Sequence, residues 1–435
     1  MDIFSLILLI FLCLLVTSLS YIDKKIYKFA FTPFVLLSVP ITIIVFLLYL
    51  IQFKYNLVNI NVKLLIIYII FLAWFWLVGF LTFLIVKKGR MFSVIKNRNE
   101  SKINLGLKQL DYIILTISFI SSSLLLYFFF KNSVNYTEFG SVVQEDFQTR
   151  YSGGINFYFR MVCMFSTVYF LGTVNKKSKW RIFAAIYSMI PIFLSFVKGL
   201  ILLPIIASFI LNKMIKGNNF KFLNLIIGIA IGIGVFFGVY LFEYGVWDLS
   251  LIFDFNTYKK IFEKLIVYLI SGNQSFNVNL TNNNSFIQPM LSNPVFAPFI
   301  NFISKAGLVD RIDNIPSNWT FIGSFPEIGH SYVNTNGFIG TLWLYCGPLI
   351  SFSMITIISI VFYLLFLRAL ISKSIINMLV YTILAATLAL GWFEYYLLHP
   401  FLYYIWILLE LLNFWVLITR RIVWEGSKKV KGFEI

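Results

Sequence analysis

Three cationic side chains stand at or inside the edges of long apolar segments. Arg150 ends a polar stretch, Arg160 follows inside the next apolar segment, and Lys198 is alone in SFVKGLILLP. Guanidinium and ammonium groups bind phosphate oxygens without a metal, and fixed positive charges stabilise a departing diphosphate. With few carboxylates nearby, these residues suit an anionic substrate whose charge increases during reaction, such as a lipid-linked diphosphate.

Each cation also has a plainer interpretation. Arg150 could anchor the chain at lipid phosphates, and Lys198 could be a simple turn residue. Arg160 is harder to explain in this way, because its head group would lie roughly 9 Å below the start of its helix, too deep for easy contact with water.

The other ionisable candidates lie on the predicted outer side, at helix ends or in the polar stretch 244–337. The carboxylates are Glu243, Glu327 and Glu394, and the only histidines are His330 and His399. The segment EIGHSYVNTNG, which contains Glu327 and His330, is the densest polar cluster beside any helix start. A lone histidine is more often structural than catalytic. His330 is favoured as a catalytic residue only by its position in this polar cluster.

The residues just before position 337 have two interpretations. Asn334, Thr335 or Asn336 could cap the helix that begins there, or they could form the edge of a working site. Arg311 has Asp310 and Asp313 beside it, which favours a local ion pair.

The composition predicts a helical membrane protein. Apolar residues make up 60% and charged residues 12% of the 435-residue chain, and the mean hydropathy is +0.86. Many stretches exceed the ~20 apolar residues that a membrane-spanning helix needs. The apolar runs are continuous, which excludes a β-barrel. We therefore expect a polytopic all-α protein forming a single membrane domain over residues 1–435.

Hydropathy predicts about eleven transmembrane helices. The first segment lacks a basic start and a small-residue cleavage site, so it is predicted to be a permanent helix and not a signal peptide. The predicted spans are 2–20, 29–53, 64–86, 110–130, 154–174, 182–197, 199–212, 222–243, 338–366, 375–397 and 401–419.

The basic residues predict the orientation. Every second connection is basic, including KKGRMFSVIKNRNESK at 87–102, NKKSKWR at 175–181 and the C-terminal tail. The positive-inside rule then places the N-terminus outside and the C-terminus inside. The net charge of +17 is explained by this rule and by lipid head groups, so nucleic acid is not an expected partner.

Two polar connections then lie outside the membrane, at 131–153 and 244–337. The second is long enough to need a fold of its own, and we expect short helices in it. YKKIFEKLIVYLI at 258–270 predicts an amphipathic helix on or near the membrane, and TNNNS at 281–285 predicts a turn. Cys13, Cys163 and Cys346 fall in apolar segments, and no metal-binding motif occurs in the outer loops, so neither a disulfide framework nor a metal or other cofactor is expected.

Four short stretches, in this order around the large loop, resemble the Wzy-type O-antigen and capsule repeat-unit polymerases. They are TRYSGG at 149–154, SFVKGLILLP at 195–204, YLISGNQSFN at 268–277 and VNTNGFIGTLWLYCG at 333–347. One position departs from the family pattern, since Cys346 precedes Gly347 where relatives often carry aspartate. Any role of that aspartate is therefore not carried over.

The resemblance implies a C-type glycosyltransferase fold in the bacterial inner membrane. The enzyme would join repeat units carried on undecaprenyl diphosphate, with a sugar hydroxyl attacking the anomeric carbon of the growing chain. Arg150, with Arg160 or Lys198, would hold the diphosphate, and His330 or Glu327 would accept the hydroxyl proton. The sugar-binding residues expected on this basis are Tyr332, Asn334, Thr335, Arg311, Trp319 and Tyr268.

Two other functions stay open. An O-antigen ligase shares the topology and cationic chemistry but transfers glycan to lipid A core. A flippase or transporter of lipid-linked oligosaccharide would need charged residues through the middle of many helices and no large folded outer loop. The partners expected in either enzyme case are lipid-linked glycans and membrane lipids, and the sequence leaves open whether a chain-length regulator binds.

Overall fold

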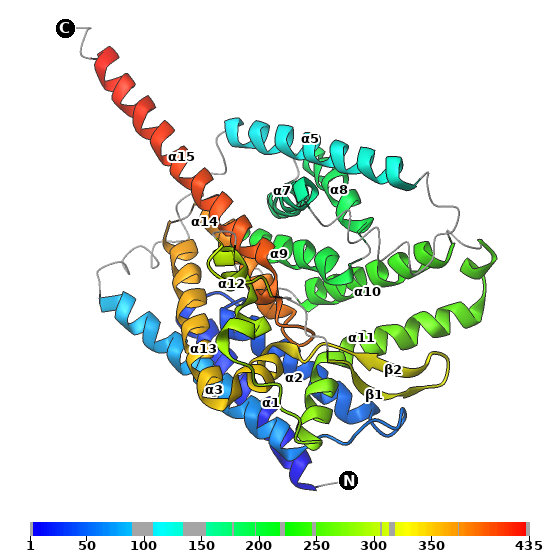
Figure 1. Cartoon of the computed structure of the whole chain (residues 1–435). Coiled ribbons are helices and arrows are strands. Elements are labelled where there is room, and N and C mark those ends of the chain that lie inside the picture. The colour runs from blue at the N-terminus through cyan, green and yellow to red at the C-terminus, as the bar shows by residue number, and fades with distance from the viewer. Residues whose placement is uncertain are drawn as a thin grey trace.

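The computed structural model describes most of the chain as helix (Figure 1). It describes residues 3–88, 108–133, 154–175, 178–195, 197–217, 222–245, 249–304, 307–312, 318–372 and 374–431. The helices are α1 (Ile3–Tyr27), α2 (Pro33–Ile51), α3 (Val62–Lys88), α5 (Lys108–Ser133), α7 (Gly154–Gly172), α8 (Trp180–Phe193), α9 (Lys198–Lys216), α10 (Phe222–Gly245), α11 (Phe255–Thr281), α12 (Ala297–Ser304), α13 (Gly337–Ser372), α14 (Ile375–Ala389) and α15 (Pro400–Lys431).

Seven of the described helices are long and apolar enough to cross a membrane: α1, α2, α3, α5, α7, α9 and α13. The other four predicted spans fall on α8, α10, α14 and α15, whose described apolar stretches are shorter. The chain is therefore a helical protein with several candidate membrane spans, and the count of eleven stays a prediction.

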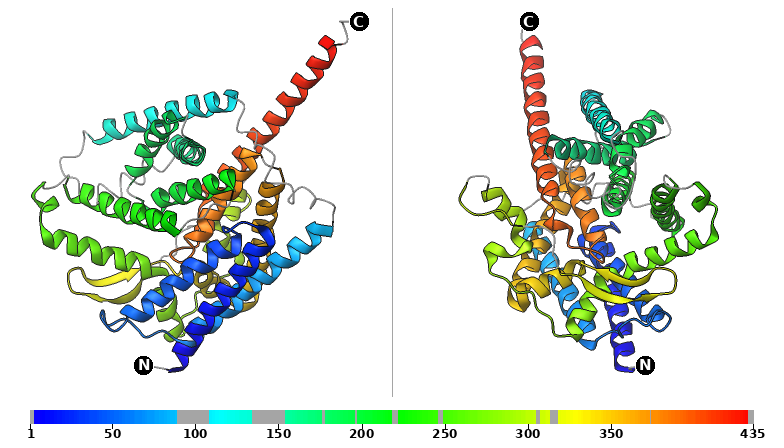
Figure 2. Two further views of the ribbon diagram at one scale, coloured as in Figure 1. Left: turned by 180° about the vertical axis from the view of Figure 1, so that it is seen from behind. Right: turned by 45° about the vertical axis from the view of Figure 1, so that its right-hand side comes forward.

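The helices pack into two groups joined by α9 and α14. α3 packs against α1 and α13, while α7 packs against α5, α8 and α9, and α14 contacts α9 on one side and α13 on the other. Figure 2 shows the first group at the end of the molecule that holds the N-terminus, with α5, α7 and α8 at the opposite end. The long α15 projects beyond both groups.

The described part of the large polar connection contains helices and one element that was not predicted. Residues 258–270 are helical as expected, and the chain turns at 282–283 as expected. The unexpected element is an antiparallel hairpin of β1 (Thr320–Phe325) and β2 (Gly329–Val333), with an irregular register between Phe321 and Gly323. The tilted pair of Tyr55 and Phe325, with ring centres 4.8 Å apart, packs the hairpin onto the α2–α3 connection.

Helix α11 extends well past the predicted amphipathic segment and buries polar residues in its second half. Asn273, Gln274 and Asn277 have no exposed surface. Asn277 donates to the Val58 and Asn59 carbonyls and accepts from the Asn61 amide, while Gln274 donates to Val58 and Ile322. Buried amides with hydrogen-bond partners are stable in a protein core. The second half of α11 is therefore packed inside the protein and does not lie on a membrane surface.

The helix α13 is broken at Gly347, whose φ of 72° and ψ of 171° are not helical. Pro348 has no amide proton, so the carbonyl of Leu344 lacks its helical donor. The Phe286 amide donates to that carbonyl at 2.9 Å, and the Asn293 side chain donates to the Tyr345 carbonyl at 2.7 Å. The loop before the hairpin therefore supplies the hydrogen bonds that the break removes.

The first turn of α1 and the hairpin lie on the same side of the molecule. Ser5 donates to the Ile60 carbonyl, and the same α2–α3 connection contacts α11 and the hairpin. Which side faces outward stays a prediction.

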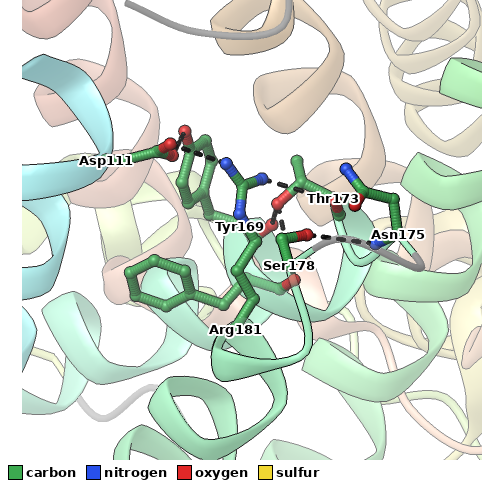
Figure 3. A network of polar contacts seen from close by, with 7 residues as sticks. Asp111, Tyr169, Thr173, Asn175, Ser178 and Arg181 are labelled. Carbon is green, nitrogen blue, oxygen red and sulfur yellow. Dashed lines mark hydrogen bonds and ion pairs between the residues drawn. The ribbon is translucent and has the colours of Figure 1, made fainter. Parts of the chain in front are cut away.

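A polar network joins α5, α7 and α8 at the opposite end (Figure 3). Arg181 forms an ion pair of 2.6 Å with Asp111 and donates to the Thr173 carbonyl, and the Tyr169 hydroxyl donates to the same carboxylate. Arg181 is only 8% exposed. The basic run 175–181 was predicted to be a topology signal and lipid contact. For Arg181 the lipid contact is wrong, because its side chain pairs with Asp111 inside the helix bundle.

Candidate functional site

Two lysines from distant parts of the chain meet over one tyrosine ring. The ammonium group of Lys198, at the start of α9, lies 4.1 Å from the centre of the Tyr240 ring. The ammonium group of Lys264, in α11, lies 4.7 Å from the same centre. An aromatic ring attracts cations, so Tyr240 of α10 is a shared neighbour of both ammonium groups. Lys264 was not among the predicted site residues.

Two further tyrosines complete what we call the lysine–tyrosine cluster (Lys198, Tyr240, Lys264, Tyr268 and Tyr396). Tyr268 is one turn after Lys264 on α11 and stacks on Phe393 with ring centres 4.1 Å apart. The Tyr396 hydroxyl lies against the backbone of Gly199, next to Lys198. Burial raises the pKa of Tyr268, so its hydroxyl stays protonated.

An acid–histidine pair adjoins this cluster. The Nε2 atom of His399 lies 3.1 Å from the Glu394 carboxylate, and the His399 ring lies 5.6 Å from the Tyr396 ring. Burial lowers the pKa of His399, but the Glu394 carboxylate raises it more, so the net pKa is above its ordinary value. The Glu394 carboxylate therefore favours the protonated form of the ring.

Arg160 lines a small pocket that borders the cluster. The pocket also contains Ser195 and Leu200, which lie on either side of Lys198, and Phe401, which packs on His399. Arg160 therefore shares a pocket with two sequence neighbours of Lys198, and direct cooperation of the two cations stays a prediction. Arg150, the third predicted cation, and most of the predicted loop 131–153 lie outside the described residues.

The structure does not bring the predicted proton acceptors to Lys198. His330 is exposed on β2, where its Nδ1 atom lies 2.8 Å from the Ser324 hydroxyl. The amide of Glu327 in the hairpin turn donates to the buried Glu263 carboxylate of α11. The next residue, Lys264, faces Tyr240 instead, so the hairpin and the cluster occupy different faces of α11.

Trp319 and the aromatic face of the hairpin border a second feature, an open cleft of about 530 Å³. Trp319 is 66% exposed and lines the cleft together with Phe321. Tyr332 is 56% exposed and packs beside Phe321 with ring centres 5.4 Å apart. The cleft is also lined by four asparagines, which are Asn279, Asn282, Asn284 and Asn318.

The segment before α13 supports this cleft from beneath. The side-chain Oδ1 atom of Asn336 accepts from the Ser275 hydroxyl and from the Asn279 side-chain amide, both on α11. The first amides of α13, at Gly337 and Phe338, donate to the carbonyls of Phe393 and Gly391. The helix start is therefore held by backbone partners and not by the predicted side-chain cap.

The remaining predicted site residues belong to neither the lysine–tyrosine cluster nor the lining of the cleft. Asn334 and Thr335 are partly buried between β2 and α13, and Arg311 is exposed in the loop after α12. Asp313, one of the two predicted partners of Arg311, lies outside the described residues. Among the side chains that the structure describes, no three of His, Cys, Asp or Glu are grouped to hold a metal ion.

The residues that sequence reasoning missed are Lys264 and the pairing of Glu394 with His399. Lys264 was visible only as one of several lysines in a predicted amphipathic helix. Glu394 and His399 were candidates singly, and their separation of five residues across a helix end gives no pattern that predicts contact.

Comparison with known proteins identifies a family but no activity. The chain belongs to a family of unknown function, DUF6337, whose model matches residues 56–422. No curated protein and no solved structure matches the chain.

Proposed function

We propose that this member of the DUF6337 family is a membrane glycosyltransferase that joins oligosaccharide repeat units carried on a lipid diphosphate. The carrier that fits the resemblance to Wzy-type polymerases is undecaprenyl diphosphate, in a bacterial inner membrane with the hairpin on the outer face. The proposal extends to polymerisation into O-antigen or capsular polysaccharide. It rests on the chemistry of the lysine–tyrosine cluster.

The observation that carries the proposal is the meeting of Lys198 and Lys264 over Tyr240. Two ammonium groups at one ring form a site for a group with two or more negative charges. Arg160 adds a guanidinium group in the neighbouring pocket, which can bind phosphate oxygens in pairs. A diphosphate has the charge and size that such a set of donors would bind.

In the proposed reaction, a hydroxyl oxygen of the acceptor unit attacks the anomeric carbon of the donor unit. A new carbon–oxygen bond forms there as the bond between that carbon and the diphosphate oxygen breaks. Negative charge then grows on the departing lipid diphosphate, where Lys198, Lys264 and Arg160 stabilise it. No metal ion is required for this step.

The attacking hydroxyl must lose its proton, and the Glu394–His399 pair is the proposed acceptor. It contacts Tyr396 of the cluster, whereas Glu327 and His330 lie on the hairpin face of α11. A histidine held by a carboxylate is a suitable general base because its partner stabilises the protonated ring.

The test is to replace each lysine in cells that depend on this protein for surface polysaccharide. We expect Lys198→Ala and Lys264→Ala each to reduce polymerisation about a hundredfold, as loss of one transition-state donor does, and to remove long chains from a gel ladder. Lys198→Arg and Lys264→Arg should retain part of the activity. The matched control is Lys216→Ala, an exposed lysine at the other end of α9.

Membrane insertion of each variant is measured alongside. Wild-type ladders from both alanine variants, with normal protein levels, would contradict the proposal. Deletion of the gene separates the two enzyme alternatives: a polymerase deletion leaves single capped units, while a ligase deletion leaves none.

A further inference from the structure

The open cleft at the hairpin end is a separate feature from the lysine–tyrosine cluster. It lies where the C-terminal end of α11 meets the start of β1. The first residue of α11 that lines it is Val278, several helical turns after Lys264. Its volume of about 530 Å³ is within the range of small-ligand sites. The cluster and the cleft share α11 but no lining residue.

The side chains that line the cleft are polar but uncharged. None of the described residues around it is Asp, Glu, Lys, Arg or His. The ammonium group of Lys63 binds the side chain of Asn283 on the turn beside the cleft, and neither residue lines it. Among the described lining residues, a charged ligand would therefore lose water without gaining an opposite charge.

The asparagines give the cleft both donors and acceptors. Asn279 is buried, and its amide group donates to Thr320 and Asn336 while its oxygen accepts from Asn284. Asn282 and Asn284 are both exposed and both line the cleft, so their amide groups are accessible to a ligand there. Each asparagine carries two donors and one oxygen acceptor, a set that matches hydroxyl and acetamido groups.

The aromatic residues supply flat apolar walls. The indole ring of Trp319 is 66% exposed, although burial of such a ring is normally favourable. The negative face of an aromatic ring attracts the polarised C–H groups on one face of a sugar. A ring left in water beside a row of amides is suited to a ligand with an apolar face and a polar edge.

We propose that this cleft binds an uncharged oligosaccharide, with Trp319 stacking on one sugar ring and Asn282 and Asn284 bonding its hydroxyl or acetamido groups. The role of the bound glycan as the acceptor or growing chain rests on the proposed function. The binding itself does not, because it requires no lipid diphosphate and no turnover.

The experiment is an NMR saturation-transfer titration of the full-length protein in detergent. The probes are two neutral tetrasaccharides, N-acetylchitotetraose and maltotetraose, and one acidic tetrasaccharide, tetragalacturonate. We expect saturable binding of at least one neutral probe and weaker binding of the acidic one. Trp319→Ala should weaken the neutral complex about tenfold, the upper end of what one aromatic contact contributes.

Two control proteins make the result specific. Phe302→Ala removes another exposed aromatic residue of the same loop that does not line the cleft, and it should bind as the wild type does. Lys198→Ala should also bind normally, since it alters only the cluster. The two proposals can fail separately. If the wild type binds a neutral probe saturably but does not extend a lipid-linked repeat unit, the binding site stands and the glycan's role in catalysis does not.

Three results would overturn the inference. They are no saturable binding of either neutral probe, equal binding of tetragalacturonate, and unchanged affinity in Trp319→Ala.

Discussion

At the scale of single residues, Gly199 shows how closely the lysine–tyrosine cluster is packed. A Cβ atom at position 199 would lie 2.0 Å from the Tyr396 hydroxyl oxygen. Tyr396 is only 3% exposed, so it has little room to move away. The glycine therefore allows α9 to begin against Tyr396. This contact fixes the position of the neighbouring residue, Lys198.

We predict that Gly199→Ala lowers stability by about 1–3 kcal/mol, the usual cost of overpacking. Tyr396→Phe removes the clashing oxygen, so adding it to Gly199→Ala should restore part of the loss. Thermal unfolding in detergent measures the wild type, both single variants and the double variant. Gly238→Ala is the control, since a Cβ there meets nothing within 4 Å. An unchanged unfolding temperature in Gly199→Ala would contradict the packing described.

Sequence alone could identify some site residues and not others. Lys198 was a candidate because it is the only charge between two apolar segments, and Trp319 because the family resemblance implies aromatic sugar-binding residues. Lys264 was not, because Lys259 and Lys260 share its amphipathic helix. Only the packing of α10 on α11 decides that Lys264 faces Tyr240, while Lys259 lies over Phe255.

At the scale of elements, apolar helices were predictable and the polar ones were not. Continuous apolar runs located all seven candidate spans, since a bilayer imposes one length and one composition. Their ends were less predictable, because α1 and α13 continue past the predicted ends at 20 and 366. The second half of α11 has Asn273, Gln274 and Asn277, which are typical of loops. It is a buried helix because carbonyls of the α2–α3 connection, far away in the sequence, accept from these amides.

The ion pair of Asp111 and Arg181 offers a test of how α5, α7 and α8 are held together. Its side chains are 18% and 10% exposed. Removing one member leaves a buried charge, so Asp111→Ala should cost about 3–5 kcal/mol of unfolding free energy. Replacing both, with Asp111→Leu and Arg181→Met, should recover most of that loss.

The matched control for this test is the pair of Arg368 and Glu410, which has similar distances but side chains 42% and 32% exposed. Glu410→Ala should cost less than about 1 kcal/mol, because water screens an exposed pair. Denaturant unfolding in detergent compares all of these proteins. Equal losses at the two pairs would argue against a buried network at the α5–α7–α8 end.

At the scale of the whole molecule, α11 connects two features that a glycan polymerase would need. Its first half carries Lys264 and Tyr268 of the cationic cluster, and its second half ends at the uncharged cleft. A lipid-linked substrate has the same division, with a charged diphosphate at one end and a sugar chain at the other. Hydropathy could not predict this division of α11 into two parts, because α11 is not a candidate membrane span.

The measurement that tests the central claim most directly is extension of a purified lipid-linked repeat unit by the purified protein. The account predicts a ladder of products that differ by one repeat unit, with one lipid diphosphate released for each bond formed and no ladder from the double variant Lys198→Ala, Lys264→Ala. Transfer of glycan only to added lipid A core, or a repeat unit that stays unextended in the presence of folded protein, would contradict it.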